Sequence, residues 1–358
     1  MLHLPKPSDA PLIQSIARNE KKEYGPGMNE EEVNPLDELR RLGAKRLGEL
    51  KVLGDELFRH MSPKDLITML FPPALGLNLL KGTLSGRTFE GEDFNNDNND
   101  CPAPELMKAV LEMARWWSTH YFSTRIYHVE NIPTDRPALI VGNHSAGLMP
   151  LDALFAMNEI RDTHGEDQRV YSLVHDFAYM APRIARVARQ MGVLRAKREN
   201  ALAALASGGH VLVYPGGDQD AFRTFAERKK VVLAGRRGFI RIALEAGVPI
   251  VPLVSVGLHE SFFVVSKGER IAQKLGLKKM LRTEVMPFSL SFPWGLVPAF
   301  FPFIPLPTAI EMEFCTPIEV TGSPDDDNLV NDIYTQVEST MQRKMDELYE
   351  NRTPLFGR

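Results

Sequence analysis

Short apolar runs alternate with helix-like segments through the middle and the end of the chain. Apolar runs typical of buried strands occupy residues 138–143, 169–174, 210–215 and 249–256, and a late strand pair is expected over 310–320. Apolar positions spaced three or four apart predict helices over residues 104–122, 182–191, 199–207 and 238–247. Buried strands that alternate with helices predict an α/β layered domain with a largely parallel central sheet flanked by helices.

The two ends of the chain differ from this pattern. Leucines at helical spacing over 14–60 and an apolar stretch over 66–80, split by two prolines, predict a helical extension and an apolar hairpin. Residues 82–103 are rich in Gly, Asn and Asp, which is typical of a linker. Three consecutive aspartates precede a final helical pattern. We therefore predict an N-terminal extension with hairpin and linker over 1–103, the α/β domain over 104–322 and a C-terminal helix over 323–358.

Residues 285–310 are uncharged, apolar and rich in aromatic side chains. Six prolines interrupt them, so the segment cannot cross a bilayer as one helix. Two interpretations remain open, a buried irregular loop and a surface that dips into one leaflet of a membrane. In the second, residues 66–80 and 285–310 form the contact surface of a protein bound peripherally to the cytoplasmic face of a membrane.

Composition and charge narrow the class of protein. Hydrophobic residues make up 44% and charged residues 25% of the 358 residues, as in ordinary soluble domains. The net charge of −4 argues against a general nucleic-acid binder. Only Cys101 and Cys315 occur, which excludes a disulfide scaffold or a zinc ribbon and favours a reducing compartment. The N-terminus lacks a basic start followed by an apolar run, so we expect no cleavable signal peptide.

The first candidate site follows the run at 138–143, where the carboxyl end of a strand would lie. It begins Asn143-His144-Ser145, and Asp152 follows His144 after seven intervening residues. A histidine at a strand end can act as a general base if a carboxylate fixes its tautomer and stabilises its cation. Alternatively, Asp152 caps the next helix and His144 is merely hydrogen-bonded. Ser145 is a weak candidate nucleophile, because a nucleophile elbow has glycine where Asn143 stands.

Two more polar clusters follow other predicted strands. One comprises Pro215, Gly216, Gly217 and Asp218, with Arg223 close behind. Its glycines let backbone N–H groups approach a ligand oxygen, although a plain tight turn would also explain them.

The other cluster comprises Arg195, Lys197 and Arg198. It lies in a basic stretch, since residues 183–241 carry thirteen Lys or Arg against four Asp or Glu. Such a field suits coenzyme A phosphates, phospholipid head groups or a carrier protein, although a solvated helix face is an equal alternative. No nucleotide-binding loop and no metal-ligand spacing is present.

Four blocks of sequence carry a resemblance to a known superfamily. They read IYHVENIPTDRPALIVGNHSAGLMPLD, GVLRAKREN, VLVYPGGDQDAFR and RRGFIRIALEAGVPIVPLVSVG, and the PWGL…IPLP and TPIEV segments follow. In this order they resemble the lysophospholipid acyltransferase-like superfamily. The third block, with Pro-Gly-Gly, looks most like the bacterial branch similar to monoacylglycerol and diacylglycerol acyltransferases. The resemblance spans about residues 120–320.

The resemblance implies transfer of a fatty acyl group from acyl-CoA, or acyl carrier protein, to a lipid hydroxyl, with no cofactor or metal. His144 would take the proton of the acceptor hydroxyl, Asp152 would orient His144, and no acyl-enzyme would form. Backbone N–H groups near Gly216 and Gly217 could hold an anionic oxygen. Substrate contacts are expected from Asn143, Ser145, Arg195, Lys197, Arg198, Pro215, Gly216, Gly217, Asp218 and Arg223. Acyl-CoA, a lipid acceptor and a membrane surface are the expected partners.

Two departures from the superfamily pattern leave alternatives open. Four residues usually separate the histidine from the aspartate, so Asp218 or Asp220 could replace Asp152 here. The phosphate-acceptor branch usually has Glu-Gly-Thr-Arg in the third block, whereas Asp218 would repel a phosphate. This favours mono- or diacylglycerol or a long-chain alcohol as acceptor, while the basic cluster keeps lysophosphatidate open.

Two alternatives come from other classes of protein. One is a serine lipase or esterase that uses Ser145, and the other is a non-catalytic lipid-binding protein with the same fold. For Tyr127, His175 and His259 a structural role is expected.

Overall fold

The computed structural model describes residues 104–357, except 146, 148, 166, 175–187, 190, 278–282, 292–294, 300–304 and 351. The predicted N-terminal extension, the apolar hairpin at 66–80 and most of the predicted helix at 182–191 lie outside these residues. The three-part division of the chain stays a prediction. None of the helices described is both long and apolar enough to span a bilayer.

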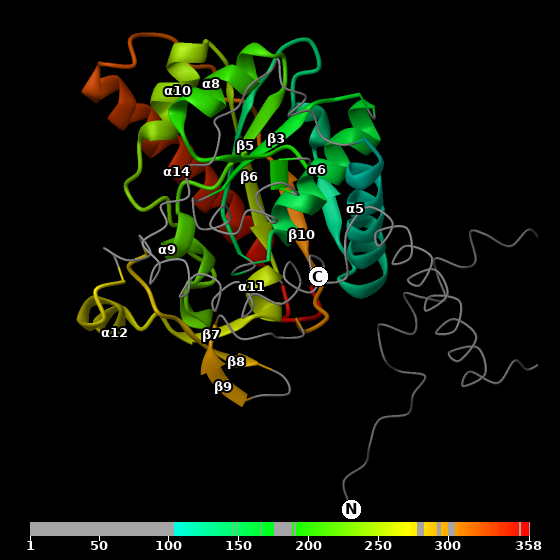
Figure 1. Ribbon diagram of the computed structural model, residues 1–358, viewed down its shortest axis with the longest axis vertical. Coiled ribbons are helices and arrows are strands. Elements are labelled where there is room, and N and C mark those ends of the chain that lie inside the picture. The colour runs from blue at the N-terminus through cyan, green and yellow to red at the C-terminus, as the bar shows by residue number, and fades with distance from the viewer. Residues whose placement is uncertain are drawn as a thin grey trace, which may run out of the picture. The chain divides into compact units, whose positions relative to one another are not determined.

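A seven-stranded sheet forms the centre of the described domain (Figure 1). Its strands in spatial order are β1 Arg125–Tyr127, β10 Glu311–Phe314, β6 Ile250–Val256, β2 Leu139–Gly142, β5 His210–Val213, β3 Val170–Val174 and β4 Val193–Arg195. Only the pairing of β10 with β6 is antiparallel, and the other five pairings are parallel. The predicted α/β fold with a largely parallel sheet is therefore confirmed.

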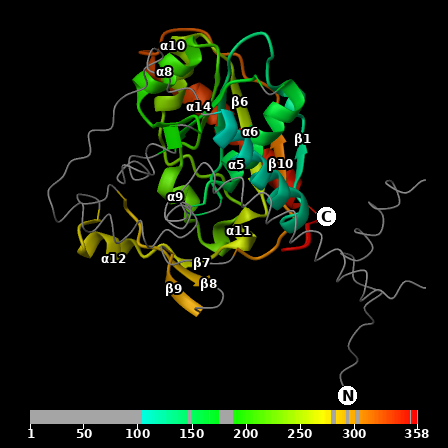
Figure 2. The ribbon, with the colours of Figure 1, turned by 45° about the vertical axis from the view of Figure 1, so that its right-hand side comes forward.

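Helices cover both faces of this sheet (Figures 1 and 2). On one face lie α5 Pro104–Trp116 and α6 Leu151–His164; on the other lie α8 Arg198–Ala206, α10 Gly238–Ala246 and α14 Asp327–Tyr349. Strand β2 shows why two layers are needed: Ile140 belongs to one buried cluster, and Leu139 and Val141 belong to the other. Both faces of the parallel strand are apolar, so both must be covered.

The C-terminal helix is present and is longer than the other helices described. The side chain of Asp326 accepts hydrogen bonds from the N–H groups of Asn328 and Leu329, which caps the start of α14. Its buried residues recur every three to four positions: Val330, Ile333, Val337, Met341, Met345 and Leu348. This stripe packs against the sheet, and the opposite side of the helix is polar.

Three local predictions were wrong. The segment at 285–310 is not an irregular loop throughout, because β8 Phe288–Ser291 and β9 Gly295–Pro298 pair within it and β7 Phe263–Ser266 joins them in a small antiparallel sheet. The expected strand pair at 310–320 is one strand, β10, followed by an isolated bridge at Ile318. The helix that starts at Pro104 is α-helical only to Trp116, and a π-helical turn follows it.

Candidate active site

Three loops meet at the carboxyl ends of neighbouring strands. Strands β5, β2 and β6 lie side by side and parallel, so the segments that follow them emerge at one edge of the sheet. The loops approach closely, since a Cβ atom on Gly142 would lie 2.5 Å from the ring of Tyr214. Figure 1 shows α9 Gly217–Ala221 and α11 Leu258–Ser261, which belong to the second and third loops, at this end of the sheet.

His144 and Asp152 are in direct contact at this edge. The ring Nδ1 of His144 lies 2.6 Å from Oδ2 of Asp152. The same oxygen accepts the N–H of Ser145 at 3.0 Å, and Oδ1 accepts the N–H of Ala153 at 2.9 Å. Asp152 lies in the first turn of α6, where the helix dipole favours a carboxylate. The side chains of His144 and Asp152 therefore meet despite the seven intervening residues. Asp152 binds main-chain N–H groups near the start of α6 and also binds the His144 ring.

The electrostatics of this pair suit a proton acceptor. Burial disfavours the imidazolium, but the charge and hydrogen bond of Asp152, with the charge of Asp220, outweigh it and raise the pKa of His144. Because an ionised carboxylate only accepts hydrogen bonds, Nδ1 carries the proton in the neutral ring and Nε2 keeps its lone pair. The side chain of Asp152 is fully buried, whereas 20% of the His144 side chain is exposed.

A second carboxylate holds the main chain of His144. Oδ2 of Asp220 accepts the His144 N–H at 2.5 Å, and Oδ1 lies 3.0 Å from Nε of Arg223. Nε of Arg223 also donates to Nε2 of His259 at 3.1 Å. All three side chains are buried, and burial raises the pKa of Asp220 to about 6 and lowers that of His259 well below its ordinary value. This network fixes the backbone from which the His144 ring projects.

We expect Arg223→Met to be less stable than the wild-type protein, by about 3 kcal/mol at neutral pH, because it leaves the Asp220 carboxylate buried without its cation. Arg223 lowers the pKa of Asp220, so the variant's pKa lies above 6. A carboxyl group whose folded pKa is raised is stabilising when protonated, and this contribution is lost as pH rises through that pKa.

The free energy of unfolding that Arg223→Met loses relative to the wild-type protein should therefore grow between about pH 5 and about pH 8. Urea unfolding at both pH values measures it, with Arg228→Met as a control on an arginine outside this network. A deficit that stays constant or shrinks with rising pH would contradict the pairing.

Asn143 and Ser145 point into the fold. The side chain of Asn143 donates to Ser145 Oγ and to the Ser255 carbonyl, both at 2.9 Å, and accepts the Ser255 N–H at 2.8 Å. It thus clamps the end of β2 to β6. Ser145 is buried, and its hydroxyl is bonded to Asn143 rather than to an imidazole. This geometry disfavours Ser145 as a nucleophile.

The Pro-Gly-Gly turn begins α9 and is tightly enclosed. A Cβ atom on Gly216 would lie 2.0 Å from the carbonyl oxygen of Val232, so a side chain there would require the backbone to move. Gly217 has φ +53° and donates its N–H to the Tyr214 carbonyl at 3.1 Å, so that N–H serves the turn and not an anionic oxygen. Arg236, which sequence reasoning missed, donates to the carbonyl of Pro215 at 2.9 Å.

Asp218 does not substitute for Asp152. Its carboxylate lies 3.2 Å from the Arg236 guanidinium and accepts hydrogen bonds from the Thr283 hydroxyl at 3.0 Å and the Glu284 N–H at 3.1 Å. Asp218 therefore ties α9 to the segment that precedes β8.

The basic cluster lies apart from His144. Arg195 ends β4, at the edge of the sheet, and β5 and β3 lie between β4 and β2. Three strand spacings amount to roughly 14 Å. Lys197 precedes α8, and Arg198 is paired with Glu245 on α10. The structure thus brings the first and third sequence blocks together, whereas the second block lies three strands away from the strand that leads to His144.

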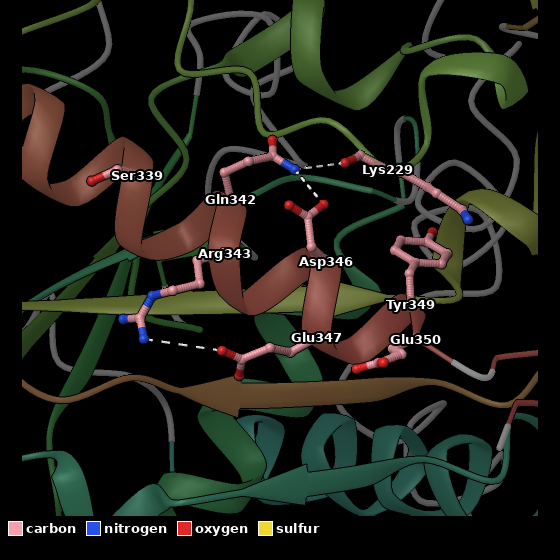
Figure 3. Close-up of a pocket in the computed structure, with 8 residues that line it drawn as sticks. All are labelled: Lys229, Ser339, Gln342, Arg343, Asp346, Glu347, Tyr349 and Glu350. Carbon is pink, nitrogen blue, oxygen red and sulfur yellow. Dashed lines mark hydrogen bonds and ion pairs between the residues drawn. The ribbon is translucent and has the colours of Figure 1, made fainter.

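A cavity of about 710 Å³ lies along the C-terminal half of α14 and contains none of the predicted site residues (Figure 3). Each of the residues that line it carries a polar or charged group: Lys229, Ser339, Gln342, Arg343, Asp346, Glu347, Tyr349 and Glu350. Gln342 donates to the Lys229 carbonyl and to Asp346, both at 2.9 Å, so these groups satisfy one another.

The parallel sheet and its strand-end histidine and aspartate are the arrangement that the resemblance to a superfamily of acyltransferases implied. Comparison with known proteins identifies the family of acyltransferases. The family model for diacylglycerol acyltransferase matches residues 97–357. The chain belongs to this family, whose members transfer acyl groups to lipids.

Relatives extend over much of the sequence. An uncharacterised protein of Mycobacterium tuberculosis is 29% identical over 82% of this chain and 78% of its own length, and the protein of Mycobacterium bovis matches equally. The human "DGAT1/2-independent enzyme synthesizing storage lipids" is 30% identical over 42% of this chain and 46% of its own. A solved 1-acyl-sn-glycerophosphate acyltransferase of Thermotoga maritima is 15% identical with TM-score 0.45, covering 85% of this chain and 97% of that one.

Proposed function

We propose that this protein transfers a fatty acyl group from a thioester, acyl-CoA or acyl carrier protein, to the hydroxyl of mono- or diacylglycerol or of a long-chain alcohol. His144 is the general base in this proposal, and Asp152 orients it. The observation that supports it most is the 2.6 Å contact between His144 Nδ1 and Asp152, which leaves Nε2 as the proton acceptor. Membership of the diacylglycerol acyltransferase family supports the same chemistry.

The reaction needs one proton relay. The acceptor hydroxyl gives its proton to Nε2 of His144 as its oxygen attacks the thioester carbonyl. The tetrahedral centre collapses, the carbon–sulfur bond breaks, and the departing thiolate takes the proton back from the imidazolium. The products are an ester and a free thiol, and His144 returns to its neutral form. The buried Asp152 stabilises the imidazolium between these two steps.

The charges around His144 support a neutral acceptor. Asp152 and Asp220 are both buried beside it, and the cation of Arg223 is directed to Asp220. A phosphate on the acceptor would face this acidic surrounding. The human relative is named for synthesising storage lipids, which are neutral, and this also favours mono- or diacylglycerol. In this proposal the basic cluster at 195–198 binds the phosphates of the acyl donor, which lie far from its thioester.

We place the reaction at the cytoplasmic face of a membrane, because the acceptor is a lipid and acyl thioesters are cytoplasmic metabolites. Two proposed substrates, one water-soluble and one in a bilayer, must then meet at the same histidine.

An acceptor panel tests the function. Purified protein is incubated with a radiolabelled acyl thioester, either acyl-CoA or acyl carrier protein, and with one acceptor at a time: monoacylglycerol, diacylglycerol, a long-chain alcohol or lysophosphatidate. The lipids are then resolved by chromatography. We expect labelled ester with the neutral acceptors and much less with lysophosphatidate. Preference for lysophosphatidate would overturn the choice of acceptor, and no labelled ester with any acceptor would favour the non-catalytic alternative.

A further inference from the structure

One face of the small sheet is largely apolar, and Ser266 of β7, which lies opposite Phe288, is its polar member. Its register sets Leu290 of β8 opposite Leu296 of β9 and Phe263 of β7, and sets Phe288 opposite Pro298. Residues directly opposite one another project to the same side of a sheet. Leu290 and Leu296 are 59% and 62% exposed, so the part of this face on β8 and β9 is open to solvent, whereas Phe263 on β7 stacks on Phe225 with ring centroids 4.4 Å apart.

Helix α12, Glu269–Lys274, begins beside the small sheet. Gly268, just before it, has φ +60°, and a Cβ there would lie 2.0 Å from the Met286 carbonyl oxygen, so the helix starts directly against the segment leading into β8. Its outer side adds the exposed side chains of Ile271 and Leu275, four residues apart. With Val265, five of the seven large apolar side chains exposed in the described residues belong to this region.

The opposite side of the small sheet is anchored beside the active site. Val264, Val285 and Ala299 are buried in one cluster with Ala221 and Phe222, which follow Asp220 directly. In Figures 1 and 2 the small sheet and α12 lie at the same end of the domain as α9 and α11. The exposed apolar face therefore has a fixed relation to the loops that carry His144.

The charged residues around this face indicate which kind of partner binds it. The described residues 265–277 carry three cations, Lys267, Arg270 and Lys274, and one acidic residue, in a chain whose net charge is −4. Lys267 is paired with Glu227 at 3.1 Å. Arg270 and Lys274 are exposed on α12, each adjacent in sequence to an exposed apolar residue. An apolar surface bordered by cations matches a bilayer that contains anionic lipid, because the apolar side chains enter the acyl boundary while the cations meet the head groups.

We propose that the face formed by β7, β8, β9 and α12 docks on a bilayer containing anionic lipid, with Leu290 and Leu296 inserted into it. Docking there turns the active-site end of the domain toward the membrane, where the proposed lipid acceptor resides. The orientation rests on the proposed function, but the docking itself requires no acyl transfer.

Insertion is tested with a fluorophore that responds to its surroundings. The full chain with Cys101→Ser, which leaves the buried Cys315 as the remaining native thiol, is labelled at Leu290→Cys or, as the control, at Phe356→Cys. Phe356 is 73% exposed and lies outside this region. With vesicles of phosphatidylcholine and phosphatidylglycerol, we expect a blue shift and quenching by brominated lipid at position 290 and neither at 356. Absence of quenching at 290, or equal quenching at both, would overturn the proposal, whatever other segments bind the vesicle.

Binding strength is measured by vesicle flotation. Leu290→Ser/Leu296→Ser should lower the partition coefficient at least about tenfold, and Phe356→Ser should leave it unchanged. Arg270→Glu/Lys274→Glu should weaken binding about tenfold or more with phosphatidylglycerol and little with phosphatidylcholine alone. Wild-type binding by the leucine variant would overturn the docking face, and so would light scattering that shows this face pairing two copies.

The same variants separate docking from catalysis. Leu290→Ser/Leu296→Ser should esterify a monomeric, water-soluble alcohol at the wild-type rate and lose activity only toward acceptors held in vesicles. Loss of both activities in this variant would contradict a purely docking role. A wild-type protein that binds vesicles but esterifies neither kind of acceptor would leave docking intact and refute the proposed chemistry.

Discussion

His144→Ala should lower kcat for acyl transfer by about 10²- to 10⁴-fold, because the acceptor hydroxyl loses the base that removes its proton. The thioester and acceptor contacts remain, so KM should change little. The ring is partly exposed, and its hydrogen bond within the described part of the chain is the one to Asp152, so the melting temperature should shift only slightly. Initial rates of ester formation from labelled acyl-CoA, read beside a thermal melt, measure both effects.

The matched control is His128→Asn. His128 is exposed and lies at φ +58°, where asparagine is tolerated, and its ring lies 3.1 Å from Glu130 and 3.9 Å from Glu313. This variant should keep the wild-type rate. Unchanged transfer by folded His144→Ala would remove the assigned base, and equal loss in both variants would show that the assay reports stability rather than chemistry.

Asp152→Asn should lower kcat about 10²-fold or more while keeping the size of the side chain. Both oxygens of the carboxylate face N–H donors: Oδ2 faces the ring of His144 and the N–H of Ser145, and Oδ1 faces the N–H of Ala153. An amide must turn its NH₂ group toward at least one of them. If it faces the ring, Nδ1 becomes the acceptor and the proton moves to Nε2, where the base is needed.

The pH profile of Asp152→Asn separates this role from simple misfolding. The charge of Asp152 raises the pKa of His144, so its loss lowers that pKa. Because the neutral imidazole is the active form, activity rises with pH through this pKa, and the acid limb of kcat/KM should move to lower pH in the variant. Asp162→Asn, a change at an exposed position of the same helix, should leave both rate and limb unchanged. An acid limb that stays in place or moves upward would contradict the pairing.

Local pattern predicted most of the elements around the site. The runs at 138–143, 210–215 and 249–256 became β2, β5 and β6, because an apolar stretch of this length flanked by turn residues is stable only when buried on both faces. The pattern missed β1 and β4, which are three residues each, and neither interpretation of the proline-rich stretch at 285–310 included the strands β8 and β9. Proline is tolerated in such strands at edges and ends, and β9 ends at Pro298.

The contacts within the site were predicted unevenly. His144 and Asp152 belong to a recognisable motif, so both could be predicted as site residues from the sequence. Their unusual spacing left open whether the two side chains would meet. Nothing in the sequence joins Arg223 to His259, which are 36 residues apart and come from different loops. Asp220 was considered as a partner for the His144 ring, but it binds the main chain instead. Which of several nearby carboxylates faces a ring depends on the paths of loops, and residue identity alone does not specify those paths.

The amino-acid sequence by itself determined the alternation of strands and helices, the polar motifs at the strand ends and the excess of cations around residues 183–241, because these are local properties of composition and spacing. Only the tertiary structure decided that β5, β2 and β6 are neighbours, that Asp152 reaches the ring while Asp220 holds the backbone, and that Leu290 and Leu296 share an exposed face. Those facts depend on which segments pack together, and packing is settled by the burial of the whole domain rather than by any one segment.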